Sequence, residues 1–257
     1  MKAVICDIDG VILHDQHTLP GASDLVRMLL GRAAPFLFLT NYPSQTPEEL
    51  AQRLREAGIA VDVPARHFYT SAIATAEFLN DQAGERRRVY VVGEGALVQA
   101  LTLAGFTITD SEADYVVLGE TPLFGFDMIR RASSLIRRGA RFVATNPDVA
   151  GPEGRPSCGA FAAPIERITG QRPFYVGKPN ALMMRAALRY MQAHSEETVI
   201  VGDNMETDII AGINSGMETV LVLSGVSQRA DLPLYAYRPH HVVNDALAVI
   251  ELLERLP

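Results

Sequence analysis

The sequence predicts an α/β protein built around a parallel sheet. Short runs of apolar, β-branched residues alternate along the chain with longer segments in which apolar residues recur every three or four positions. This alternation is typical of βαβ units, and turn-forming residues separate the two kinds of segment. Strands are expected at Ala3–Ile8, Phe36–Thr40, Val89–Val92, Tyr115–Leu118, Arg141–Ala144, Thr198–Val201 and Thr219–Leu223.

The residues at their ends identify the helices between these strands. Thr46 offers an N-cap, Pro47 suits the first helical position, and Glu49 completes a capping box. Gly58 is placed to end this helix. Two further helices are expected over Leu182–Ala193 and Asp208–Asn214.

Two turn-rich stretches indicate a second domain inserted into the first. Residues 80–88 are polar and charged, and residues 170–173 precede a new apolar run. We therefore expect a discontinuous core of residues 1–79 and 175–257, interrupted by a domain of residues 80–174 that has strands and helices of its own. The length of 257 residues allows for two such unequal domains.

Charge and cysteine usage exclude several classes of protein. The chain has 23 basic and 30 acidic residues, a net charge of −7, and no basic run longer than Arg86–Arg88, so a nucleic-acid partner is not expected. Cys6 and Cys158 are too few for a disulfide framework. No apolar segment is long enough for export or for a membrane span, and a cytoplasmic location is expected.

Two aspartates stand at the end of the first predicted strand, in Asp7-Ile8-Asp9-Gly10. Side chains at positions i and i+2 of an extended chain point the same way, so these carboxylates are expected to converge. Like charges at that distance require either a protonated carboxyl or a cation. Ligands of open α/β sheets bind at this kind of strand end. A pair of solvated turn acids is the plainer alternative.

A second acidic group follows a later strand, in Gly202-Asp203-Asn204-Met205-Glu206-Thr207-Asp208. Oxygen ligands at strand ends suit Mg²⁺, which binds through a few carboxylates and keeps several waters. Alternatively, Asp203 and Asp208 would cap the following helix, whose N-terminus favours acidic side chains. Capping explains one acid more readily than four acids at two strand ends.

Two elements suited to a phosphoryl group lie between the acidic groups. Thr40 and Asn41 follow the second predicted strand, and Lys178 stands before a helix. A hydroxyl, backbone N–H groups and a compact positive charge can together hold phosphoryl oxygens. Each residue alone is more often an ordinary strand-end or surface residue, so their order along the chain carries the argument.

That order, Asp-x-Asp, Thr, Lys and Gly-Asp-x4-Asp, resembles the four motifs of the haloacid dehalogenase superfamily of phosphohydrolases. Stretches such as VICDIDGV, LTNYPSQT, FYVGKP and HSEETVIVGDN resemble its NagD-type ribonucleotide monophosphatase subgroup, over roughly residues 3–227. The resemblance implies a Rossmann-like doubly wound parallel sheet core with an inserted smaller α/β cap of the C2 type.

The resemblance also implies a role for each motif residue. Asp7 corresponds to the nucleophile, and Asp9 to the general acid/base. Mg²⁺ is expected on the Asp7 carboxylate, the Asp9 backbone carbonyl and Asp203. The substrate phosphate is expected near Thr40, Asn41, Lys178 and Asn204, with Thr40 and Lys178 also taking part in catalysis, and with Asp208 just behind the metal ligands.

Cap loops lie over the leaving group in this family, which makes Asn146 and Asp148, in Thr145-Asn146-Pro147-Asp148, candidates for setting specificity. Plain turn chemistry explains these residues equally well.

The predicted function is Mg²⁺-dependent hydrolysis of phosphomonoesters through an aspartyl-phosphate, with nucleoside monophosphates such as UMP as substrates and sugar phosphates as secondary ones. The partner expected is this small molecule, neither nucleic acid nor membrane, and no oligomeric state is indicated. A phosphatase for another small phosphomonoester, such as phosphoglycolate or pyridoxal phosphate, is the close alternative. A receiver-type module, which needs only one domain of about 120 residues, and a non-catalytic phosphate-binding module are remote ones.

Overall fold

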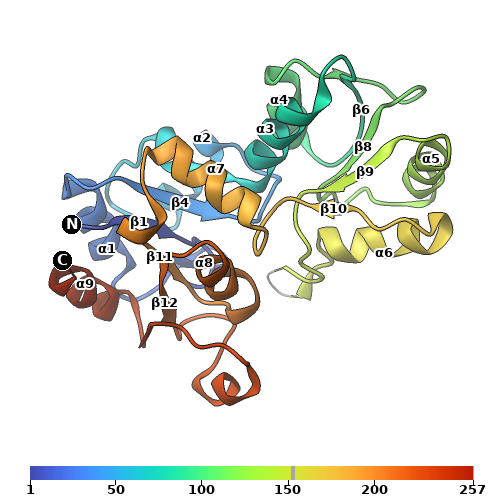
Figure 1. Cartoon of the computed structure of the whole chain (residues 1–257). Helices are drawn as coiled ribbons and strands as arrows, with labels where there is room; N and C mark the ends of the chain where they lie inside the picture. Colours follow the sequence, from blue (N-terminus) through green and yellow to red (C-terminus); the bar gives the residue numbers. More distant parts are fainter. Residues whose placement is uncertain (152–153, 257) are drawn as a thin grey trace. The chain divides into compact units, whose positions relative to one another are not determined.

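The computed structural model describes residues 1–151 and 154–256, which form two compact units (Figure 1). Unit 1 comprises Met1–Thr40, Pro47–Tyr69 and Lys178–Pro257. Unit 2 comprises Asn41–Thr46 and Thr70–Gly177. Each unit is a sheet of parallel strands flanked by helices, which confirms the predicted α/β class with a second, inserted α/β unit.

Unit 1 is built on a six-stranded sheet of order β13-β12-β11-β1-β4-β5. The pairings of β1 with β4 and β11, of β11 with β12 and of β12 with β13 are all parallel. The chain winds from β1 toward β5, then returns to lay β11 on the other side of β1. Ligands of such sheets bind where the winding direction reverses, here between β1 and β11. The strands are β1 (Ala3–Cys6), β4 (Phe36–Thr40), β5 (Phe68–Thr70), β11 (Thr198–Gly202), β12 (Glu218–Val222) and β13 (His241–Val243).

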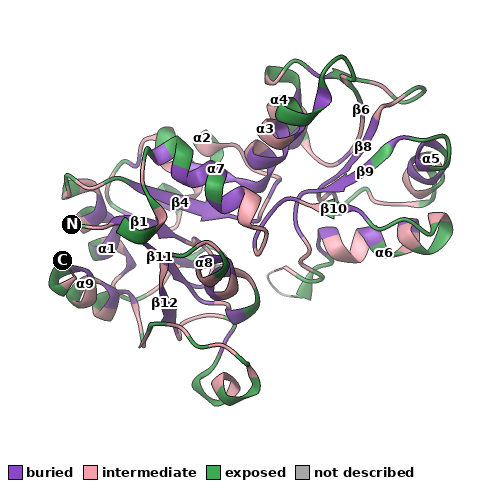
Figure 2. Cartoon of the chain, in the orientation of Figure 1, coloured by how far each residue is buried: buried purple, intermediate pink, exposed green. Residues whose placement is uncertain are grey.

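Helices cover both faces of this sheet. On one face α1 (Ala22–Gly31), α2 (Pro47–Glu56) and α9 (Ala246–Arg255) share one hydrophobic core with alternate strand residues such as Val4 and Phe38. On the other face lie α7 and α8, which contact each other (Figure 1). Figure 2 shows the strands buried between these layers. The remaining elements are α7 (Ala181–Met191), α8 (Ile210–Asn214), the hairpin β2 (Leu13–His14) and β3 (His17–Thr18), and three short 3-10 segments, Ala65–His67, Ser195–Glu197 and Arg229–Leu234.

Unit 2 has a five-stranded parallel sheet of order β10-β9-β8-β6-β7. Helices α5 and α6 pack against Val116, Leu118 and Phe142 in its core. The elements are α3 (Ser71–Ala83), β6 (Arg88–Val92), α4 (Gly95–Leu103), β7 (Thr107–Ile108), β8 (Tyr115–Leu118), α5 (Phe126–Arg137), β9 (Arg141–Ala144), α6 (Cys158–Thr169) and β10 (Phe174–Tyr175).

The expected domain boundaries, after residues 79 and 174, fall inside α3 and β10. The long stretch of unit 2 instead begins at Thr70 and ends at Gly177, and the short segment Asn41–Thr46 also belongs to unit 2. The displacement has a local cause at each end. The Thr70 side chain accepts a hydrogen bond from Ile73 N and so caps α3 as one helix. β10 pairs in parallel with β9, which ties it to the sheet of unit 2.

The first strand is shorter than predicted, because β1 ends at Cys6 rather than Ile8. The Ile8 carbonyl accepts hydrogen bonds from the backbone N–H groups of Ile12 and Leu13, so the chain turns out of the sheet at this point. Within the described residues, no helix is both long and apolar enough to cross a membrane.

Candidate active site

Three carboxylates meet at the carboxyl ends of β1 and β11. Asp7 follows β1, Asp203 and Asp208 follow β11, and one oxygen from each lies within 4.8 Å of the other two. Asp203 and Asp208 are buried, and the Asp7 side chain is only 12% exposed. A compact set of hard oxygen donors fits a small divalent cation such as Mg²⁺. Parallel strands bring these residues together because their carboxyl ends share one edge of the sheet.

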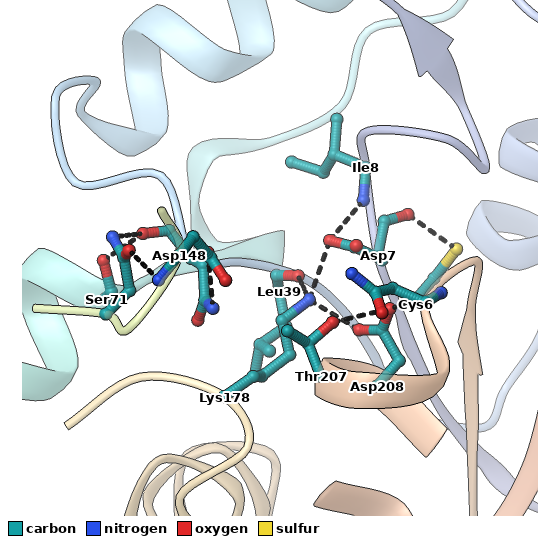
Figure 3. Close-up of polar contacts among 12 residues, drawn as sticks. Cys6, Asp7, Ile8, Leu39, Ser71, Asp148, Lys178, Thr207 and Asp208 are labelled. Carbon is teal, nitrogen blue, oxygen red and sulfur yellow. Dashed lines mark hydrogen bonds and ion pairs between the residues drawn. The ribbon is translucent and has the colours of Figure 1, made fainter. Parts of the chain in front are cut away.

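Lys178 lies within this group, as Figure 3 shows. Its Nζ is 2.6 Å from Asp208 Oδ1 and 3.0 Å from Asp7 Oδ1, and it donates to the Leu39 carbonyl of β4 at 3.4 Å. An ammonium donates hydrogen bonds and accepts none, so each of these oxygens is a suitable partner. Its side chain is 3% exposed. The lysine charge is therefore fixed beside Asp7, which is what a phosphoryl-binding role requires.

The pKa values of this group follow from burial and mutual charge. Burial raises the pKa of Asp7 well above its usual range, Lys178 opposes the shift, and the other carboxylates add to it. Burial and then the charge of Asp208 raise the pKa of Asp203 to about 7. Burial alone would lower the pKa of Lys178, but Asp208 and Asp7 outweigh it and raise that pKa. A charged lysine thus leaves the group with surplus negative charge, which a divalent cation would neutralise.

Asp203 is held by the loop that follows β12. Val226 N donates to Asp203 Oδ2 at 2.6 Å, and Ser227 N donates to the Asp203 carbonyl at 3.0 Å. Gly225 leaves room for this carboxylate, since a Cβ there would lie 1.9 Å from Asp203 Oδ2. Gly10 packs against the same side chain with φ +80°. Sequence reasoning missed this loop, whose one signal was a glycine soon after a predicted strand.

Asn204, and neither aspartate, caps the following helical segment. Its Oδ1 accepts from Glu206 N at 2.8 Å. Asp208 Oδ2 instead accepts from Asn204 N at 3.2 Å, while its Oδ1 faces Lys178. The helix predicted from Asp208 begins earlier, as a π-helical turn over Met205–Ile209 that runs into α8. The capping alternative for the two aspartates is therefore wrong.

The Asp9 carboxylate does not join the three-carboxylate group. Its Oδ1 accepts from Arg53 Nη2 of α2 at 2.7 Å. The strand ends at Cys6 and the chain turns at Gly10, so Asp7 and Asp9 do not lie in one extended segment, but the charge of Asp9 still adds to the rise in the pKa of Asp7. Arg53 was not singled out from the sequence, where it resembles any other arginine of an amphipathic helix.

The other predicted residues divide between the two units. Thr40 is buried at the end of β4 in unit 1, whereas Asn41 is the first residue of unit 2. Asn41 Nδ2 donates to Asp148 Oδ2 at 2.9 Å, and Asn146 Nδ2 donates to the Asn41 carbonyl at 2.9 Å. Ser71 Oγ donates to the same carbonyl, as Figure 3 shows. Asn41, Asn146 and Asp148 thus form one polar group within unit 2.

Comparisons with known proteins show which family the chain belongs to. The family model described as haloacid dehalogenase-like hydrolase matches residues 4–107, and one described as HAD-hydrolase-like matches residues 175–249. The chain is 54% identical to the ribonucleotide monophosphatase NagD of Escherichia coli K12, over 93% of this chain and 94% of that protein. It is 45% identical to a dihydroxyacetone phosphatase of Corynebacterium glutamicum, over 93% and 87%, and 35% identical to the 5'-nucleotidase YutF of Bacillus subtilis, over 95% of each.

Solved structures give the same result. NagD from E. coli K-12 matches with a TM-score of 0.91 and 53% identity, over 96% of this chain and 97% of that chain. A p-nitrophenyl phosphatase from Archaeoglobus fulgidus matches with a TM-score of 0.89 and 32% identity, over 98% of each. The resemblance seen in the motifs is confirmed. The chain belongs to the haloacid dehalogenase-like hydrolases and is a phosphomonoester hydrolase among them.

Proposed function

We propose that this protein dephosphorylates nucleoside monophosphates such as UMP, with sugar phosphates as secondary substrates, and that it uses Mg²⁺ and an aspartyl-phosphate on Asp7. The observation that carries the chemistry is the Asp7 carboxylate, which lies 3.0 Å from Lys178 Nζ and close to two further carboxylates at the switch point of the sheet. The choice of substrate rests on the 54% identical relative, which is a ribonucleotide monophosphatase. Other relatives are named dihydroxyacetone phosphatase and acid sugar phosphatase.

The carboxylates of Asp7 and Asp203 suit a magnesium ion, and the backbone carbonyl of Asp9 would complete the protein ligands as in the family. When bound there, Mg²⁺ supplies positive charge that offsets the charge of the phosphoryl oxygens and of the attacking carboxylate. Asp208 already accepts hydrogen bonds from Lys178 and from Asn204 N. We therefore assign it to holding the lysine in place, just behind the metal ligands.

Asp7 is oriented as a nucleophile by two donors on one of its oxygens. Ile8 N donates to Oδ1 at 2.9 Å, and Lys178 Nζ lies 3.0 Å from the same atom. Oδ2 is thereby the oxygen that attacks phosphorus. The Oδ2–P bond forms as the ester P–O bond breaks, and splitting the reaction in this way replaces one difficult step by two easier ones.

Asp9 serves both half-reactions. In its acid form it gives a proton to the departing alkoxide, and as a carboxylate it then takes a proton from the water that attacks phosphorus and releases phosphate from Asp7. Thr40 and Lys178 hold the phosphoryl oxygens through a hydroxyl and an ammonium, and Asn204 stands beside them. We expect neutralisation of the phosphoryl charge and positioning of the reacting groups to supply most of the rate enhancement, because acid/base catalysis contributes only about 10²–10⁴-fold.

We assign the choice of leaving group to the polar group of Asn41, Asn146 and Asp148. Its support is that two residues of the loop after β9, Asn146 and Asp148, bind Asn41, which directly follows Thr40. The plainer alternative is that these hydrogen bonds only shape the loop. Asp148→Ala separates the two: a change in the kcat/KM ratio of UMP to a small phosphate ester supports the assignment, and an equal loss for both contradicts it.

Phosphate release across a panel of substrates tests the proposed function. The panel holds nucleoside monophosphates, sugar phosphates, phosphoglycolate and pyridoxal phosphate, each with Mg²⁺ and with EDTA. The expected result is Mg²⁺-dependent release with the highest kcat/KM on nucleoside monophosphates. A higher value on another ester would replace the substrate and keep the mechanism. No release from any of them by folded protein would favour a non-catalytic or receiver-type module.

A further inference from the structure

The geometry points to Arg53 as a positioning residue for the acid/base step, a role that acts through Asp9 and rests on the proposed function. Arg53 Nη2 lies 2.7 Å from Asp9 Oδ1 and 2.8 Å from the Asp15 carbonyl oxygen. One guanidinium nitrogen therefore holds both the carboxylate and the backbone of the loop that carries it. Within the part of the chain that the structure describes, Arg53 makes no hydrogen bond or ion pair with Asp7 or Lys178, the residues assigned to the phosphoryl group.

The environment of Arg53 differs from that of its neighbour on the same helix. The side chain of Arg53 is 19% exposed and reaches inward to Asp9. Arg55 is 49% exposed and pairs with Asp62, which is 79% exposed, at the surface. Exposed pairs of that kind are strongly screened by water. The Arg53 pair is more sheltered, so its geometry is better defined and the two arginines form a matched comparison.

The second contact fixes the loop as well as the side chain. Asp15 lies at the tip of the β2–β3 hairpin with φ +54°, a left-handed conformation that is uncommon for a residue other than glycine. Its carbonyl accepts from the same nitrogen that binds Asp9. At the base of the hairpin, Gly10 N donates to the Leu13 carbonyl at 2.7 Å. Arg53 thus ties the hairpin tip back to the residue that begins the loop.

The chemistry of the guanidinium gives this contact a catalytic consequence. Arginine stays protonated and can only donate hydrogen bonds, so the oxygen that it binds must accept in both protonation states of Asp9. Oδ1 is that oxygen. The exchangeable proton is therefore carried by Oδ2, which presents the same atom to the leaving group in the first half-reaction and to water in the second. Without Arg53 the carboxyl group can rotate and present either oxygen.

The dependence of rate on the leaving group tests this role. We would measure kcat/KM for aryl phosphates of graded leaving-group pKa, from 4-nitrophenyl phosphate to phenyl phosphate, and for UMP as an alkyl ester. In Arg53→Met we expect kcat/KM for UMP to fall by about 10²-fold, within the span of acid catalysis, and that for 4-nitrophenyl phosphate by less than about tenfold. The slope of log(kcat/KM) against leaving-group pKa becomes steeper, while KM changes little.

Three further variants test the positioning role of Arg53 more closely. Arg53→Lys still donates and should recover part of the loss. Arg55→Met is the control and should keep the wild-type slope. In the double variant Asp9→Asn/Arg53→Met, loss of Arg53 should cost almost nothing beyond Asp9→Asn, because the two residues act as one unit. If Arg53→Met does not fold, Arg53→Gln replaces it in the same measurements.

Two results would overturn the inference: an equal loss for all leaving groups, or a loss that adds fully to that of Asp9→Asn. Either would make Arg53 a scaffold residue only. A different result would contradict the proposed function. The single variant Asp9→Asn, with Arg53 intact, would then keep the wild-type slope of log(kcat/KM) against leaving-group pKa. That outcome removes the acid/base role of Asp9, and this inference with it, in a variant in which Arg53 is unchanged.

Discussion

Lys178 and Asp208 form a buried ion pair, with Nζ 2.6 Å from Oδ1 and side chains that are 3% and 1% exposed. Two charges in such a place stabilise the fold only while both are present, because each alone would carry a large desolvation cost. Since Asp208 also accepts from Asn204 N, the position of the lysine is tied to the loop after β11. The pair therefore connects the charge beside Asp7 to the segment that carries Asp203.

Asp208→Asn should reduce both activity and stability. The amide leaves the Lys178 charge with one carboxylate fewer, so we expect kcat/KM to fall by about 10²-fold and unfolding to become easier by about 3 kcal/mol. Phosphate release and thermal unfolding measure the two effects. Glu206→Gln, at an exposed position two residues earlier, is the control. Activity within twofold of wild type would contradict the assignment of Asp208 to the lysine.

Asp7→Asn should abolish turnover, because an amide oxygen is a poor nucleophile and the side chain no longer carries the negative charge that faces Lys178. We expect a loss of about 10⁴-fold or more, the scale seen when a nucleophile is removed from an enzyme. Acid quenching during turnover, followed by mass spectrometry, should find a phosphorylated peptide containing Asp7 in wild type and none in the variant. Asp24→Asn, on the exposed side of α1, should behave as wild type. A phosphoenzyme in Asp7→Asn would refute the nucleophile assignment.

Gly225→Ala should weaken the cation site although it replaces none of the proposed metal ligands. A Cβ at this position would lie 1.9 Å from Asp203 Oδ2, so either the loop or the carboxylate must move. We expect the apparent Mg²⁺ affinity to fall by about 10–100-fold, as on loss of a group that orients a metal ligand. Titration of activity with Mg²⁺ measures it. Gly31→Ala is the matched control, since nothing lies within 4 Å of its Cβ. Equal Mg²⁺ affinity in both variants would argue against this support of Asp203.

The metal-free protein should lose stability as the pH rises through neutrality. Burial raises the pKa of Asp203 to about 7, against about 3.9 in an unfolded chain. Between these values the folded protein binds more protons, so the stabilising contribution is complete below about pH 4 and is lost as the pH passes 7. In EDTA, the melting temperature of wild type should fall from pH 5.5 to pH 8 more than that of Asp203→Asn.

Addition of Mg²⁺ should reverse this trend. The cation requires ionised carboxylates, so its apparent affinity grows with pH over the range in which Asp203 loses its proton. We expect Mg²⁺ to raise the melting temperature of wild type more at pH 8 than at pH 5.5, and to have little effect on Asp203→Asn. If the melting temperature depends on pH in the same way in wild type and in Asp203→Asn, both with and without Mg²⁺, then Asp203 does not titrate in this range.

The strand pattern could predict the fold class and the meeting of Asp7 with Asp203 and Asp208, whereas the place of Lys178 beside them followed from the family resemblance. Acidic motifs stand directly after apolar strands, and parallel strands bring their carboxyl ends to one edge of a sheet. This reasoning needs only the strand periodicity and the short spacing between strand and motif. It therefore holds even though the last residue of each strand is displaced by one or two positions.

The partners of Asp9 and Asn41 could not be predicted in the same way. Whether Asp9 points like Asp7 depends on where β1 stops and how the chain turns, and this is decided by hydrogen bonds to Ile8 rather than by residue pattern. Asn41 lies with unit 2 because Asn146 and Asp148 bind it from more than a hundred residues away. Contacts of such long range leave no local signal in the sequence.

The pairing of β1 with β11 joins Ala3 to Thr198. During synthesis the nucleophile segment emerges first, and its neighbouring strand follows only after the whole continuous stretch of unit 2, Thr70–Gly177, has been made. A nascent chain that stops at Gly177 contains Asp7 but neither Lys178 nor Asp203. The order of residues thus postpones assembly of the active site until Lys178, Asp203 and Asp208 have been made, and the continuous stretch Thr70–Gly177 of unit 2 can form its own contacts before β1 meets β11.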